Sequence, residues 1–125
     1  MPAVEDGQSW GFPDCYGQGG DACASAAQMP VAELDQHAAV SGVAITTGQL
    51  GTSVGTAAIV AEWAKSELVI VPLDPSEPAM ASAPSATITG LSNPVGVTLS
   101  PDGSLYAGDW STGTIYKIRA AATAG

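Results

Sequence analysis

Apolar and polar residues alternate most clearly between residues 93 and 119, and this pattern predicts three short β-strands. The predicted strands are Pro94–Leu99, Ser104–Asp109 and Thr114–Ile118. In the first strand the apolar side chains share one parity, at Val95, Val97 and Leu99. Alternation of this kind is typical of strands that bury one face against a core.

Two turns separate these strands. Ser100–Gly103 has the sequence SPDG, in which proline fixes φ and glycine accepts a positive φ, and Ser111–Gly113 provides the second reversal. The pattern therefore predicts an antiparallel three-stranded meander. Such a meander has two open edges and too little core to be stable alone, so we expect it to pack against another part of the protein.

The preceding part of the chain predicts four more strands, joined by glycine-rich or tight connections. They are Val40–Thr47, Thr56–Trp63, Glu67–Leu73 and Ala86–Leu91. A short helical turn is predicted at Val31–His37. Four strands followed by three match one blade of a β-propeller and most of the next. The predicted organisation is an irregular segment 1–35, a first blade 36–91, a three-stranded second blade 92–119 and a frayed tail 120–125.

The predicted fold class is thus all-β, and composition adds that the protein is packed and globular, because 46% of the residues are hydrophobic and only 12% are charged. The 15 glycines and 9 prolines favour short strands and turns over long helices. A formal net charge of −9 argues against nucleic acid or an anionic membrane surface as a partner. The same excess of acid fits either a solvated surface or a protein that collects a divalent cation. Asp102 and Asp109 are therefore either cation ligands or, as is usual for aspartate in turns, caps of their own backbone.

The sequence contains no apolar run long enough to span a bilayer, and its first ten residues lack the pattern of a signal peptide. Cys15 and Cys23 are close enough to form a disulfide, which would contribute roughly 2–3 kcal/mol by closing a short loop. Two free thiols or half of a metal site are the alternatives. A disulfide would indicate an extracellular or periplasmic location.

Several motifs, in this order, resemble the glucose/sorbosone dehydrogenase-like family of PQQ-dependent quinoprotein β-propellers. They are GFPDCYG, LDQHAAVSGVAITTG, ELVIVPL and NPVGVTLSPDGSLYAGDWSTGTIYKI. The resemblance covers most of residues 9–119 and corresponds to the C-terminal blades of that family.

The resemblance implies a six-bladed propeller that binds pyrroloquinoline quinone and Ca²⁺ and oxidises a sugar or an aldehyde. By analogy, the main-chain carbonyls of Gly11 and Pro13 would lie near the calcium ion. Ser41 and Gly42 would begin a strand that lines the cofactor site. His37, the only histidine, is the candidate catalytic base.

The chain also departs from the family pattern. Residues Ala61–Ser66 read AEWAKS where related proteins carry His-Gly-Ser-Trp-Asn-Arg. Only three basic residues are available to hold an anionic quinone, namely Lys65, Lys117 and Arg119. We therefore expect the chain alone to be inactive as a dehydrogenase. The alternative is a non-enzymatic binding or scaffolding module that completes its ring by homo-oligomerisation or with a partner subunit that supplies the missing strands.

Overall fold

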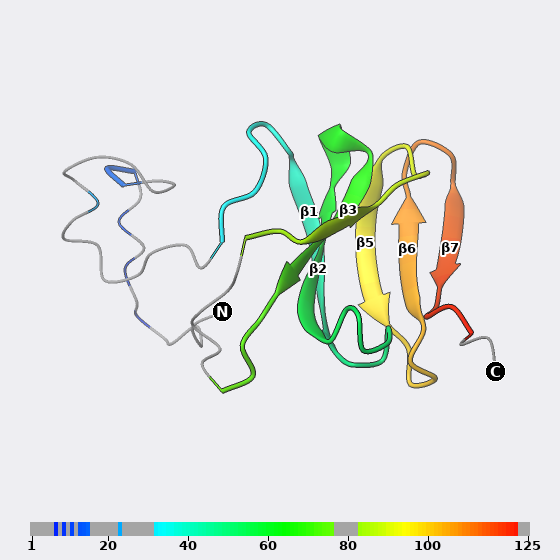
Figure 1. Ribbon diagram of the computed structural model, residues 1–125. Helices are drawn as coiled ribbons and strands as arrows, with labels where there is room; N and C mark the ends of the chain where they lie inside the picture. The colour runs from blue at the N-terminus through cyan, green and yellow to red at the C-terminus, as the bar shows by residue number, and fades with distance from the viewer. Residues whose placement is uncertain are drawn as a thin grey trace.

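In the computed structural model, residues 7, 9, 11, 13–15, 23, 32–76 and 83–122 are described, and their regular structure is almost entirely β. Seven strands form two separate antiparallel sheets, one of four strands and one of three (Figure 1). Neither sheet closes on itself. Within these residues no helix has the length and apolar character needed to cross a membrane.

The first sheet has its strands in sequence order, with β2 and β3 in its centre. Its strands are β1 (Val40–Thr47), β2 (Thr56–Glu62), β3 (Glu67–Pro72) and β4 (Ala86–Ile88). The central strands are buried along most of their length because both of their faces are covered. This two-sided burial explains their continuous apolar sequence, which does not alternate.

The second sheet is the predicted meander. It contains β5 (Pro94–Leu99), β6 (Leu105–Asp109) and β7 (Thr114–Ile118) in that order. The turn between β5 and β6 has Gly103 at φ +80, and the turn between β6 and β7 has Gly113 at φ +67. Both glycines adopt the left-handed backbone that the turn sequences predict.

The two sheets pack face to face, and most of the apolar core lies between them. In this stack β5 lies against β1 and β2. The buried residues of this core are Leu50, Ala57, Ile59, Ala61, Leu68, Ile70, Leu91, Leu105 and Ala107. The expectation that the meander packs against another part of the protein is therefore confirmed.

Several predicted boundaries were wrong by a few residues. The second strand ends at Glu62, and Trp63–Lys65 instead forms the short 3-10 turn η2, which closes with Ser66 in the left-handed region at φ 62. The fourth strand ends at Ile88, since Gly90 turns the chain at φ +96 and sends Leu91 into the core. The third strand ends at Pro72 rather than Leu73, and the sixth begins at Leu105 rather than Ser104.

The predicted helical turn at Val31–His37 is absent from its described part. Residues 32–35 carry no regular structure, and a turn follows at Gln36 and His37. Leu34 packs against the outer face of the first sheet, so the chain follows that sheet instead of coiling. His37 and Ala39 both have a positive φ, which is incompatible with a right-handed helix.

Val95 does not share a face of β5 with Val97 and Leu99, so the prediction for this residue was wrong. The pairing of β5 with β6 shifts register between Pro94 and Val97. Val97 and Leu99 pack on the core, whereas Val95 is 38% exposed on the opposite side. A shift of one residue in a strand sends the following side chains to the other face.

The first sheet lies within the predicted unit 36–91 and the second within 92–119. Most of the predicted irregular segment 1–35 falls outside the described residues, as do the last three residues of the predicted tail 120–125. Residues 120–122 are exposed and carry no regular structure.

Candidate functional site

The predicted cofactor-binding residues Ser41 and Gly42 lie at the contact between the two sheets. The Ser41 hydroxyl donates a hydrogen bond of 2.9 Å to the carbonyl oxygen of Pro94. A Cβ placed on Gly42 would lie 2.3 Å from the carbonyl oxygen of Val95. Both residues therefore let β1 approach β5 closely, a role for which only glycine has the space at position 42.

His37, the predicted base, lies at the surface in the turn that precedes β1. Its backbone is left-handed, with φ 58. It lines none of the three surface hollows described below. A general base must come within hydrogen-bonding reach of a bound substrate, and none of these three hollows offers such a position beside His37.

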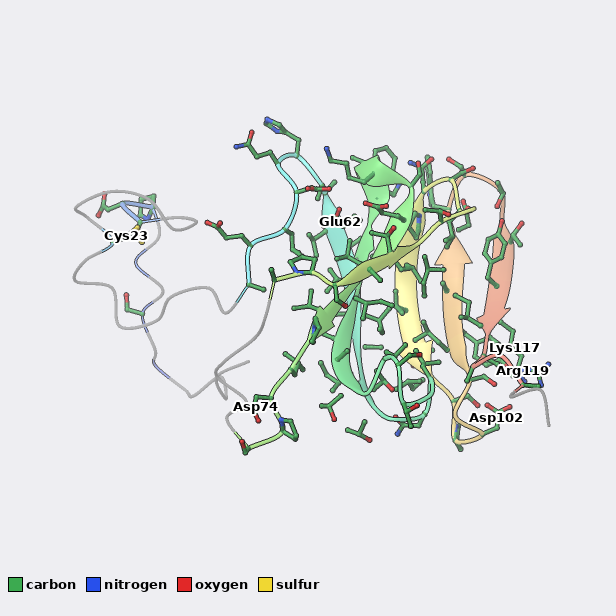
Figure 2. All side chains as sticks on the ribbon, viewed as in Figure 1. Cys23, Glu62, Asp74, Asp102, Lys117 and Arg119 are labelled. Carbon is green, nitrogen blue, oxygen red and sulfur yellow. A yellow bond between two sulfur atoms is a disulfide. The ribbon has the colours of Figure 1, made fainter. Side chains whose placement is uncertain are left out.

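The predicted calcium ligands Gly11 and Pro13 lie in the segment that carries the disulfide. The carbonyl oxygen of Gly11 accepts a hydrogen bond of 2.8 Å from the main-chain N–H of Cys15. Cys15 and Cys23 are joined by a disulfide, with their Cα atoms 4.8 Å apart, as the sequence predicts. This segment is shown at the left of Figure 2, where Cys23 is labelled.

The residues near Ser41 and Gly42 do not fit a bound quinone. Pyrroloquinoline quinone carries three carboxylates, and their recognition needs clustered cationic donors. Lys117 is already paired with Asp102 at 2.9 Å. Lys117 and Arg119 also lie at the opposite end of the sheets from Glu62, as Figure 2 shows, which leaves Lys65 in η2 as the single basic residue on the side of β1.

The turn aspartates cap the backbone, as their position in turns suggests. The carboxylate of Asp109 accepts hydrogen bonds from main-chain N–H groups of two segments. In the segment before β5 the donors are Ser92 at 2.6 Å and Asn93 at 3.3 Å. In the β6–β7 turn they are Ser111 at 3.1 Å and Thr112 at 3.3 Å. The bond from Ser92 is the largest cause that holds the pKa of Asp109 below its usual value. Asp109 thus connects the chain before β5 to the β6–β7 turn.

Asp102 has a similar role in the β5–β6 turn. Its carboxylate accepts hydrogen bonds of 2.9 Å from the Lys117 ammonium and 2.9 Å from the main-chain N–H of Ser104. The lysine contact is the largest cause that lowers the pKa of Asp102, and the same contact raises the pKa of Lys117. Both side chains remain substantially exposed, so the pair contributes little to stability.

The outer face of the second sheet, which points away from the core, exposes large apolar side chains. Trp110 is 72% exposed, Ile115 is 74% exposed and Val95 is 38% exposed. They line a shallow hollow of about 310 Å³. The Trp110 ring also lies near that of Trp63, with the ring centroids 6.4 Å apart. We call this surface the β5–β7 outer face.

The outer face of the first sheet is also apolar. It is built on Ala58, Val60, Val69 and Val71, which Ala32, Leu34 and Leu73 cover in part. Beside this cover, Val43 and Ile45 remain 50% and 41% exposed. A small hollow of about 140 Å³ lies between the covering residues and the sheet. We call this surface the β1–β3 outer face.

Three acidic side chains meet at one end of the β1–β3 outer face, which the sequence analysis did not anticipate. Asp35, Glu62 and Glu67 bring carboxylate oxygens within 4.8 Å of one another. They line the largest of the three hollows, about 330 Å³, together with Glu33 and Leu34. One signal was present in the sequence: Glu62 has the same strand parity as Ala58 and Val60, which makes it a charged residue in line with apolar ones on the same face.

No protein-family model matches the chain, and no curated protein matches it either. The fold and the surfaces described above are therefore the basis for the functional proposal.

Proposed function

We propose that the chain is a two-blade unit of a β-propeller and that its function is assembly, in which further copies of the same chain pack on its two outer faces to complete a ring. This is the scaffolding alternative rather than the dehydrogenase. The observation that carries it is the exposure of apolar side chains on both outer faces, with Trp110 and Ile115 the most exposed. Large exposed apolar surfaces mark sites of protein interaction.

The internal packing supports a second copy as the occupant. The two sheets of one chain already pack face to face through apolar side chains, with the first strand of the second sheet next to the first strand of the first sheet. Repeating this contact between copies would place the β5–β7 outer face of one chain on the β1–β3 outer face of the next. Such a head-to-tail contact closes into a ring when a whole number of copies, each rotated by the same angle, completes a full turn.

The sheet edges add a further reason for association. Among the described residues, β7 pairs only with β6, so its outer edge carries backbone groups without a strand partner. Open edges of this kind favour pairing with additional chain. A neighbouring copy could therefore contribute both a facing sheet and strand pairing.

The test compares the solution mass of the wild type with that of Ile115→Asp, measured by light scattering. We expect the wild type to be a small multiple of the 12.4 kDa monomer and the variant to be a monomer, because a buried unpaired carboxylate would oppose the contact. Ser53→Asp, in the exposed turn between β1 and β2, adds the same charge away from both faces and should leave the oligomer intact.

A wild type that stays monomeric at high concentration would overturn the proposal, as would an oligomer that Ile115→Asp leaves unchanged. Ile115 is mostly exposed, so its replacement should not unfold the monomer. A parallel sample with pyrroloquinoline quinone and Ca²⁺ tests the dehydrogenase hypothesis separately, through binding of the quinone.

A further inference from the structure

The acidic cluster draws its members from two strands of the first sheet and from the segment that precedes the sheet. Asp35 comes from the segment before β1, Glu62 ends β2 and Glu67 begins β3. Glu62 and Glu67 are directly paired across the β2–β3 ladder. Like charges in such a position repel each other, so the arrangement is unfavourable in the absence of a counter-charge.

Glu62 is the most unusual member of the cluster because it is fully buried, at 0% exposure. Neither of its carboxylate oxygens has a hydrogen-bond partner of good geometry, although the main chain of Asp35 is near enough to lower the pKa of Glu62 by less than burial raises it. A buried carboxylate without a partner is among the most costly groups in a protein interior. Its burial, followed by repulsion from Asp35, raises the pKa of Glu62. The side chain thus has two unsatisfied acceptors at the point where two further carboxylates converge.

We propose that Asp35, Glu62 and Glu67 form a binding site for a hard divalent cation, Ca²⁺. All the donors are carboxylate oxygens, with no histidine or cysteine among them, which favours calcium or magnesium over zinc. Calcium–oxygen distances of about 2.3–2.6 Å allow two ligands of one ion to lie up to about 5 Å apart, and the three carboxylate oxygens lie within 4.8 Å of one another. Magnesium, at about 2.0–2.1 Å, would require the cluster to contract.

The surroundings can complete the coordination. Three carboxylates supply between three and six oxygens, whereas Ca²⁺ takes about 6–8. The adjoining hollow of about 330 Å³ leaves room for water ligands, and Glu33 on its wall adds negative charge. Lys65, in turn η2, is a basic residue near enough to lower the pKa of Glu62, but its effect is smaller than those of burial and Asp35.

Binding would tie the segment that contains Asp35 to the first sheet. Leu34, its neighbour, covers part of the β1–β3 outer face, so the cation would fix that cover in place. All three ligands belong to one chain, and binding is therefore expected for the monomer as well as for an oligomer. The cluster adjoins the β1–β3 outer face that the proposed assembly uses, but calcium binding can be measured on the monomer, so the two proposals can fail separately.

The test measures CaCl₂ binding to the full chain by calorimetry at constant ionic strength, after treatment with EDTA. We expect one site per chain with a Kd of about 10⁻⁴–10⁻³ M, the range of carboxylate sites in extracellular modules. Glu62→Gln should weaken binding at least about tenfold, since it removes a charged ligand while keeping the side chain's shape. Asp35→Asn, at an exposed position, should weaken it as well without risk to folding.

A charge-matched control separates a defined site from general attraction to an acidic protein. Asp14→Asn removes one exposed negative charge away from the cluster and should leave the Kd nearly unchanged. Terbium luminescence gives a second readout, because Trp63, next to Glu62, can sensitise a lanthanide bound there. The proposal is overturned if calcium does not bind at about 10 mM, or if Asp14→Asn weakens binding as much as Glu62→Gln does.

Discussion

Gly42 on β1 lies directly against the main-chain carbonyl of Val95 on β5, where a Cβ would come within 2.3 Å of the oxygen. This contact sets the distance between the two sheets. Because the obstructing atom belongs to the backbone, it cannot move aside as a flexible side chain would. The neighbouring bond from the Ser41 hydroxyl to Pro94 fixes the same junction.

Gly42→Ala should therefore destabilise the protein by about 1–3 kcal/mol, the usual cost of overpacking a well-packed contact. Gly108→Ala is the matched control, since a Cβ at Gly108 on β6 would meet no atom within 4 Å; because Gly108 lines the hollow on the β5–β7 outer face, both variants are compared at a concentration at which the chain is monomeric. Denaturant unfolding at one fixed protein concentration measures both variants. Equal stability of the two would show that the sheets are not packed as described.

Asp109 should make the stability of the protein depend on pH in the acidic range. The hydrogen bonds from Ser92 and its neighbours lower its folded-state pKa below the unfolded value of about 3.9. The unfolded chain then binds more protons, so this contribution is fully present above the unfolded pKa and is lost as the pH falls through the folded pKa. Asp109→Asn should reduce stability at neutral pH. It should also make the melting temperature fall less steeply as the pH is lowered. An unchanged slope between pH of about 5 and 2 would contradict this.

Glu62→Gln should raise the melting temperature of the calcium-free protein at neutral pH, because it removes a buried charge that has no hydrogen-bond partner. The same substitution should abolish stabilisation by added calcium. Thermal unfolding in EDTA and in CaCl₂ measures both effects on one variant. Glu33→Gln, on the wall of the same hollow but exposed, should change the calcium-free melting temperature little. If Glu62→Gln lowers the calcium-free melting temperature, the carboxylate has a favourable partner after all.

The disulfide should stabilise the chain by about 2–3 kcal/mol, the value expected for a short closed loop. Cys15→Ser should lower the unfolding midpoint under non-reducing conditions. Adding a reductant should then bring the wild type to the level of the variant and leave the variant itself unchanged. A wild type that is equally stable with and without reductant would remove the argument for an oxidising compartment.

The strands were predictable because their signals are local. Alternation and turn residues located β1, β5 and β7 at their observed bounds, and Gly103 and Gly113 marked the turns between the strands of the second sheet. The spacing of Cys15 and Cys23 likewise indicated the disulfide.

The errors have non-local causes. The register shift that exposes Val95 depends on its pairing with β6, and the path of residues 32–35 depends on the surface that Leu34 covers. The acidic cluster joins Asp35 to Glu62 and Glu67 only once the sheet has formed. The role of Ser41 and Gly42 in packing could not be inferred either, because it requires β5 to be in place.

The most direct measurement is the solution mass of the wild type by light scattering, at about 0.15 M salt and again at higher salt. A two-blade unit that assembles through apolar faces should give a small, defined multiple of 12.4 kDa. Because each copy carries a net charge of −9, the oligomer should become more stable as salt screens the repulsion. A monomer of 12.4 kDa at every salt and protein concentration would contradict the proposed assembly.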